Sequence, residues 1–260
     1  MRLQPLANKP RTHAASHLMS ILYVARLVRG DVITTTSFLA RRVSKWTLNE
    51  DRRLMRLMQY IWHHLDYILM HALHPKDLPD AELHYYQDAE LGGDPLTTTK
   101  ATGGFWLELS SKCGSRTWPI CWQSKKAGHT SCATADSETW SCIGACEQGL
   151  KKDVIPILQQ IGVSLGRMVK LVCMEDNTAC IAAIQRGYSP ALRHLQRHVR
   201  LSTGFAHEVF FPDLTDPTAP QYWSKLDYCE TKKQKGDWMT TELTPIQHTA
   251  ALQLAGYSKG

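Results

Sequence analysis

Four acidic residues after residue 80 are placed where their carboxylates could act together: Asp88, Glu138, Asp176 and Asp237. Asp88 lies within the first strand predicted there, and Asp176 ends a short apolar strand. Glu138 falls in the first turn of a predicted helix, and Asp237 starts the last one. Strand ends and the starts of neighbouring helices converge in an α/β sheet, so we expect the four side chains to meet.

Carboxylates gathered in this way repel one another unless cations neutralise them. Oxygen ligands suit Mg²⁺ or Mn²⁺, which keep bound waters and accept a substrate phosphate as a further ligand. Two such ions can activate a water and stabilise the leaving oxygen in phosphodiester cleavage. The alternative for each acid is a cap or a helix-dipole partner, and Asp176 before Asn177 is a plausible N-cap.

The elements that must position these acids begin with three alternating strands. Leu83–Leu91, Gly103–Ser110 and Arg116–Gln123 alternate in polarity, and the turn at Lys112–Ser115 predicts an antiparallel meander. The later elements are predicted in chain order: helix Asp136–Leu150, helix Asp153–Ile161, strand Lys170–Met174, helix Thr178–Arg186, basic helix Pro190–Ser202, and a last strand plus helix over Leu226–Glu242. This order predicts an α/β fold with mixed strand directions.

The first 80 residues have a helical period instead. Apolar residues predict helices over His17–Arg29 and Val32–Lys45. A third helix starts at the capping box of Thr47 and Glu50 and is predicted to end near His74. We expect the three amphipathic helices to pack on another part of the protein.

Charge and cysteine content limit the classes of protein. Residues 1–80 hold 12 Lys and Arg against 6 Asp and Glu, whereas residues 81–260 hold 18 of each, so the net charge of +6 lies in the first third and hints at a polyanion. Neither a signal peptide nor a membrane helix is predicted, which indicates an intracellular protein with no membrane partner. The eight cysteines favour reduced, buried thiols. A zinc site using Cys142 and Cys146 is an alternative.

Eight segments between residues 15 and 243 resemble, in order, the C-terminal end of a copia-type retrotransposon polyprotein. They are HLMSILYVARLVRGD (17–31), the helix 53–67, YQDAELGGD (86–94), TGGF (102–105), WQSKK (122–126), ATADSETW (133–140), EDN (175–177) and LDYCETKKQKGDWMTTEL (226–243). In that family these segments form the tail of the reverse transcriptase and its RNase H domain.

The resemblance implies an RNase H-like fold: a mixed five-stranded sheet, with a three-stranded antiparallel meander plus parallel strands, flanked by helices. It implies a helical transcriptase thumb or connection remnant at 1–80, an RNase H-like domain at 81–245 and a C-terminal tail at 246–260. Matching motifs assign the catalytic and metal-ligating roles to Asp88, Glu138, Asp176 and Asp237. The implied activity is Mg²⁺- or Mn²⁺-dependent hydrolysis, with two ions, of the RNA strand of RNA–DNA hybrids.

The chain also departs from the family pattern. Glu90, Asp136, Thr139, Gly236 and Glu242 replace family residues, and none of these changes removes a presumed metal ligand. They indicate a divergent copy, so a non-enzymatic nucleic-acid-binding remnant is the alternative. The Tyr-x-Asp-Asp turn of a polymerase is absent from the sequence, which excludes polymerisation by this chain alone. The implied partners are an RNA–DNA hybrid and the rest of the polyprotein.

Basic residues close to the motifs are candidates for phosphate contacts, which position a nucleic acid without reading its sequence. They are Lys125, Lys126, Arg193, Arg197, Arg200, Lys232, Lys233 and Lys235. The alternative for each is a solvated basic surface. His194 and His198 lie one helical turn apart and could bind a metal, and His248 could assist product release.

Overall fold

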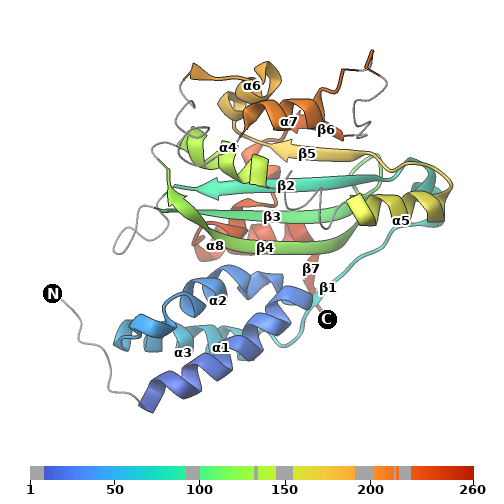
Figure 1. The fold of residues 1–260 in the computed structure, drawn as a ribbon. Helices are drawn as coiled ribbons and strands as arrows, with labels where there is room; N and C mark the ends of the chain where they lie inside the picture. The colour runs from blue at the N-terminus through green and yellow to red at the C-terminus, as the bar shows by residue number, and fades with distance from the viewer. Residues whose placement is uncertain are drawn as a thin grey trace.

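A five-stranded mixed sheet forms the centre of the computed structural model, which describes residues 9–91, 100–131, 134–144, 155–190, 202–213, 215–216 and 224–260. Its strands are β2 Glu82–Glu90, β3 Lys100–Ser110, β4 Thr117–Thr130, β5 Leu171–Glu175 and β6 Ser224–Tyr228. They lie in the order β4-β3-β2-β5-β6 (Figure 1). Strand β3 pairs antiparallel with both β2 and β4, and β5 and β6 run parallel to β2. The predicted fold class, an α/β fold with a mixed five-stranded sheet flanked by helices and preceded by a helical segment, is confirmed.

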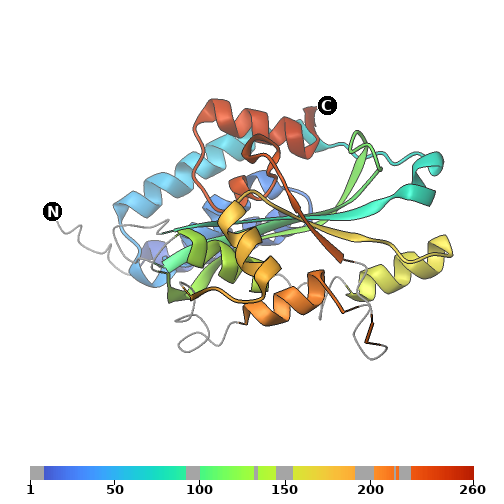
Figure 2. The same ribbon diagram turned by 90° about the horizontal axis from the view of Figure 1, so that it is seen from above.

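One face of the sheet is covered by α4 Thr134–Gly144, α5 Ile155–Leu165, α6 Thr178–Arg186 and α7 Thr203–Phe210, which we call the upper layer (Figures 1 and 2). These helices and strands share one apolar core, which includes Leu83, Leu107, Leu171 and Ile184. Strand β5 reads Leu-Val-Cys-Met-Glu, and its residues are buried except for Met174, as expected of a central parallel strand.

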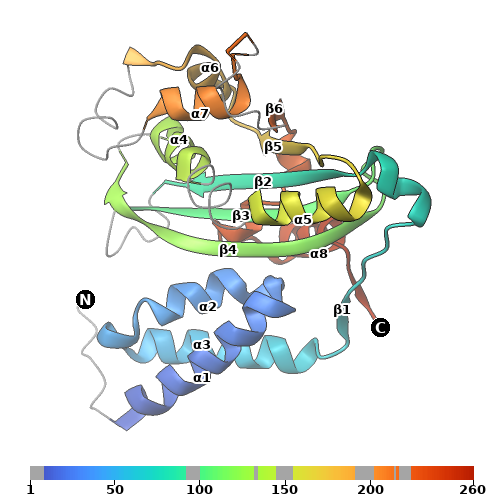
Figure 3. The same ribbon diagram turned by 45° about the vertical axis from the view of Figure 1, so that its right-hand side comes forward.

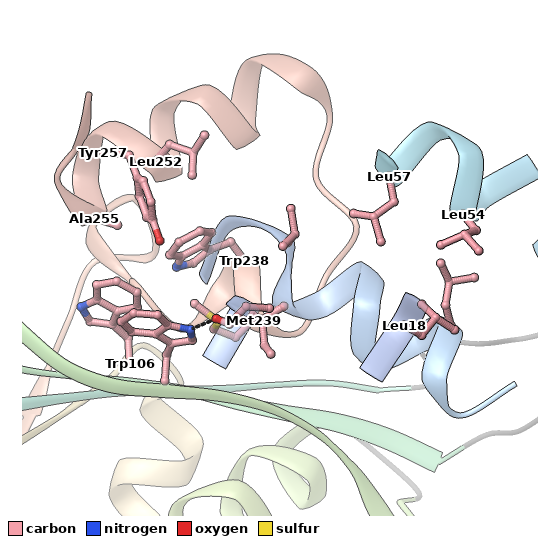
Figure 4. Close-up of a cluster of buried hydrophobic side chains, with 14 of the residues drawn as sticks. Leu18, Leu54, Leu57, Trp106, Trp238, Met239, Leu252, Ala255 and Tyr257 are labelled. Carbon is pink, nitrogen blue, oxygen red and sulfur yellow. Dashed lines mark hydrogen bonds between the residues drawn. The ribbon is translucent and has the colours of Figure 1, made fainter. Parts of the chain in front are cut away.

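The other face is covered by a lower layer that consists of α1 Lys9–Leu27, α2 Ile33–Ala40, α3 Leu48–His63 and α8 Pro245–Ala255 (Figure 3). A second apolar core lies between this layer and the sheet. Figure 4 shows it: Leu18, Leu54 and Leu57 come from the helices, and Trp106 rises from β3 beside Trp238. The expectation that the first three helices pack on another part of the protein is therefore confirmed.

A short two-stranded sheet joins the segment after α3 to the C-terminal end of the described chain. Strand β1 Tyr67–Leu69 pairs antiparallel with β7 Tyr257–Lys259. The prediction that the third helix continues to His74 is therefore wrong, because the helix ends at His63 and the chain turns into β1. The apolar residues after His63 still keep a helical spacing, but pairing with β7 overrides it.

The second half of the chain differs from the prediction in its helices. Helices α7 and α8 were not predicted, because the first follows a stretch assigned to a basic helix and the second lies beyond the motifs. After β6 the chain forms only short 3-10 helices, η7 Thr231–Lys233 and η8 Asp237–Met239, in place of the expected helix. Most of the predicted basic helix Pro190–Ser202 lies outside the described residues.

The proposed division at residues 80 and 245 stays a prediction. Residues 246–260 form most of α8 together with β7, and Leu252, Ala255 and Tyr257 are buried in the lower core. Among the described helices, none is both long and apolar enough to cross a bilayer.

Candidate metal centre

Three of the four predicted acids meet at the carboxyl ends of β2 and β5. Asp88 lies two residues before the end of β2, and Asp176 directly follows β5, its parallel neighbour. Glu138 projects from the second turn of α4. One carboxylate oxygen from each of the three lies within 4.8 Å of the others.

Asp237, the fourth acid, begins η8 beside this trio. Burial raises the pKa of its carboxyl to about 7, and the negative charges of Asp88 and Asp176 add to the effect. The hydroxyl of Thr240, at the end of the same turn, donates a hydrogen bond to Asp88 Oδ2. The structure thus brings three of the four predicted acids together, with Asp237 near enough for the charges of Asp88 and Asp176 to act on it.

The electrostatics of the site are those of buried carboxylates that lie close to one another. Burial raises the pKa of Glu138 to about 10, and the charges of Asp88, Glu175 and Asp176 contribute. Burial also raises the pKa of Asp88, partly opposed by the hydrogen bond from Thr240. Glu138 Oε2 is buried with no hydrogen-bond partner among the described residues. A buried acceptor without a donor, on a carboxylate that lies close to two others, fits a divalent cation in chemistry.

The capping alternative for Asp176 is wrong. Asn177 is the N-cap of α6, and its side-chain oxygen accepts hydrogen bonds from Ala179 N at 3.0 Å and Cys180 N at 3.1 Å. In α4 the acidic residue of the first turn is Asp136, so Glu138 lies one turn too late to act there. Two of the four acids are therefore not used by the helix ends beside them.

Sequence reasoning missed the buried polar residues around the acids. Glu175 is fully buried beside Asp176, accepts a hydrogen bond from Gln87 Nε2, and accepts another from Asn177 N at 3.0 Å. Gln234 is buried between β2 and β5. The sequence shows these residues only as polar positions in largely apolar segments. Such positions do not distinguish a residue that orients a metal ligand from the ligand itself.

Of the predicted pair Cys142 and Cys146, the second residue lies outside the described residues. Cys142 instead lies near Glu175 and Cys180, with one potential ligand atom of each within 4.8 Å of the others. All three residues are buried. A fourth ligand of the kind zinc requires is not found with them in the described part of the chain.

The candidate phosphate contacts are in very different places. Lys125 on β4 and Lys232 and Lys233 on η7 are exposed, and Lys126 is partly exposed. Lys235 is a correction: it is 6% exposed, and its Nζ donates to both carboxylate oxygens of Glu108, at 2.7 and 2.8 Å. Since the ammonium is already paired inside the protein, it does not reach a phosphate.

The remaining candidates are remote or outside the described chain. Arg193, Arg197 and Arg200, with His194 and His198, belong to the residues that the structure does not describe. His248 lies in the lower layer, where its ring packs edge-on against Tyr60 with centroids 5.7 Å apart.

Comparison with known proteins gives distant similarities. No protein-family model matches the chain. The N-terminal RNase H domain of a Mycobacterium tuberculosis protein, fused to maltose binding protein, is 12% identical with a TM-score of 0.34; the match covers 67% of this chain and 99% of that one. The native protease–reverse transcriptase of prototype foamy virus is 13% identical with a TM-score of 0.33. That match covers 68% of this chain and 20% of the viral one. The fold assignment rests on the order and directions of the strands in the sheet.

Proposed function

We propose that this chain is a retroelement-derived ribonuclease H that hydrolyses the RNA strand of RNA–DNA hybrids with divalent metal ions. The observation that carries the proposal is the meeting of Asp88, Glu138 and Asp176, whose ligand oxygens lie within 4.8 Å of one another. A purely structural role does not explain the three carboxylates, because their mutual repulsion costs folding free energy unless a cation is bound.

Each acid has a definite part in this scheme. Asp88, Glu138 and Asp176 would hold one divalent ion, and Asp237 would help to hold the second. When bound, two such ions activate a water and stabilise the leaving oxygen. Mg²⁺ and Mn²⁺ are the ions that suit an all-oxygen ligand set. Thr240 orients Asp88 through its hydroxyl, so that one Asp88 oxygen is left for the ion.

The substrate class follows from the site and the surface around it. A hybrid carries 2′-hydroxyls and phosphates along a wide minor groove, which distinguishes it from duplex DNA. The exposed side chains of Lys125, Lys232 and Lys233 could contact its backbone without reading its sequence. Lys126 and the three arginines at 193, 197 and 200 remain candidates for the same role.

The proposed origin is a copia-type polyprotein, because eight segments match that family in order. Residues 1–80 would then derive from the transcriptase and residues 81–245 from its RNase H domain. The rest of that polyprotein would be the protein partner, and the location would be intracellular. The alternative, suggested by the divergent positions, is a non-catalytic remnant that binds the hybrid. Absence of cleavage would favour it.

A cleavage assay on a labelled RNA–DNA hybrid tests the proposal. We expect Mg²⁺-dependent cleavage by the parent and at least about a 100-fold loss in Asp176→Asn, because loss of even an outer-shell partner of a metal commonly costs 10–100-fold. Asp66→Asn is the matched control, since Asp66 is exposed and lies between α3 and β1. Cleavage that is unchanged in Asp176→Asn would show that the proposed site is wrong. If none of the three proteins cleaves but all still bind the hybrid, the non-catalytic binding alternative is supported.

A further inference from the structure

The parallel pairing of β2 with β5 stops just before the proposed metal centre, and a buried amide occupies the place where it stops. The last register pair is Tyr86 with Met174. Beyond it, Gln234 Nε2 donates to the carbonyl oxygen of Gln87 at 3.0 Å and to that of Met174 at 3.2 Å. The side chain of Gln234 therefore bridges the two strands that carry Asp88 and Asp176.

The other end of the same amide holds the backbone before Asp237. Gln234 Oε1 accepts a hydrogen bond from Gly236 N at 3.1 Å. Gly236 in turn lies against β2, because a Cβ there would come within 2.9 Å of Gln87 C and 3.0 Å of Asp88 N. Gln234 is 3% exposed and cannot be reached by substrate in this conformation.

The turn that follows is anchored to β2 a second time. Met239 N donates to Gly236 O at 2.9 Å and Thr240 N to Asp237 O at 3.1 Å, which closes η8. The Thr240 hydroxyl then reaches Asp88. Asp237 thus lies between two attachments to the strand that carries Asp88, and Gln234 makes the first of them.

We propose that Gln234 is a positioning residue that fixes Asp237 relative to Asp88 and Asp176 without touching metal or substrate. The expected effect on metal binding rests on the proposed function. Only a carboxamide makes all three hydrogen bonds. Its NH₂ group donates to the two carbonyl oxygens, and its oxygen accepts from Gly236 N. A carboxylate keeps the acceptor and loses the donor, and a thioether loses both.

Hydrogen exchange of the metal-free protein tests the placement independently of any activity. In Gln234→Met we expect at least about tenfold faster exchange at Met239, Thr240 and Thr241, the amides that close η8. Amides of the β3–β4 ladder should keep their rates. Unchanged exchange at η8, or an equal acceleration in both places, would overturn the inference. Gln247→Met is the matched control, because Gln247 caps α8 at an exposed position.

Metal affinity tests the consequence. We expect the dissociation constant for Mn²⁺, measured from the electron paramagnetic resonance signal of the free ion, to rise about tenfold in Gln234→Met and to stay unchanged in Gln247→Met. In the cleavage assay the Mg²⁺ requirement should rise while KM for the hybrid stays within about twofold. Equal Mn²⁺ affinity in parent and Gln234→Met would overturn the positioning role.

A second substitution covers a folding failure of the first. Gln234→Glu keeps the shape and the acceptor and should shift exchange and Mn²⁺ affinity in the same direction, provided its circular dichroism matches the parent. If the parent binds Mn²⁺ but does not cleave a hybrid, the proposed activity fails while the exchange and affinity results still decide the role of Gln234.

Discussion

At the scale of single residues, the Glu138 carboxyl accounts for much of the folding free energy that the site loses when no metal is bound. It is 5% exposed, one oxygen has no donor among the described residues, and two other acids face it. Its pKa of about 10 in the folded chain lies well above the ordinary value of 4.5. The folded state therefore holds this proton more tightly than the unfolded state does.

That difference gives a pH-dependent stability. The stability associated with protonated Glu138 is fully present below about pH 4.5 and is lost as pH rises through about 10. Without metal, we expect Glu138→Gln to be more stable than the parent at pH 8, by roughly 1–3 kcal/mol, and equal to it near pH 4.5. Urea unfolding at both pH values, in the presence of a chelator, measures this.

Added Mg²⁺ provides the control. It should raise the urea midpoint of the parent at pH 8 and have much less effect on Glu138→Gln, because ligand binding to the folded state stabilises it. A stability difference that is the same at both pH values would show that the substitution acts by packing and not by charge.

The pair of Lys235 and Glu108 is a second buried charge centre, on the lower face of the sheet. Trp106 Nε1 also donates to Glu108, at 2.8 Å. Because the ammonium would be left without its counter-ion, we expect Glu108→Gln to lower the free energy of unfolding by roughly 3–5 kcal/mol. Guanidinium unfolding measures the loss. The double variant Glu108→Gln/Lys235→Met should recover part of it, and no recovery would contradict a charge effect.

At the scale of elements, strands were more predictable than helix ends. Alternation of polarity located β2, β3 and β4, and a turn of Lys112–Ser115 located the hairpin between the latter two. The apolar run of β5 and the adjacent acid gave Asp176. These patterns are local, so the sequence alone contains them.

The elements that failed depend on distant partners. Tyr67–Leu69 becomes a strand because Tyr257–Lys259 pairs with it, and no local pattern carries that pairing. The turn at Asp237 is a short 3-10 helix because Trp238 and Met239 are buried under the lower layer. The same limit applies to Lys235: its charge suggested a phosphate contact, whereas its burial depends on Glu108, far away in the sequence.

Gly236 connects the element scale to the site. An added Cβ would meet backbone atoms of β2, which cannot move aside as a side-chain end can. We expect Gly236→Ala to destabilise the protein by about 1–3 kcal/mol through overpacking and to lower metal affinity. Thermal unfolding and Mn²⁺ titration measure the two effects. Gly128→Ala is the control, because nothing lies within 4 Å of its Cβ position, and equal effects in both variants would contradict the explanation.

At the scale of the whole molecule, the lower layer and the sheet share one core. Trp122 Nε1 donates to the Ala25 carbonyl at 2.8 Å, and Trp122 stacks on Trp106 with centroids 4.9 Å apart. Thr34 Oγ1 donates to the Trp238 carbonyl at 2.6 Å, so α2 holds the turn that carries Asp237. Residues 9–70 therefore contribute to the site although none of them is a proposed ligand.

Removal of α1, α2 and α3, which leaves α8 in place, should therefore disrupt the rest. We expect a fragment of residues 81–260 to lose its near-ultraviolet circular dichroism and to bind a hydrophobic dye, because Trp106, Trp122 and Trp238 lose their cover. Full-length protein is the reference. A fragment that unfolds cooperatively and binds Mn²⁺ as the full chain does would show that residues 81–260 fold independently.

The pairing of β1 with β7 also bears on how the molecule is made. Strand β1 lies early in the chain and finds its only described partner among residues 257–259. During translation the first three helices leave the ribosome long before that partner exists, with their apolar faces uncovered. Since distant contacts form slowly and late, we expect β1 to pair only after residue 259 has emerged, whereas the apolar faces of the helices are covered earlier, once Trp106 and Trp122 of the sheet are available.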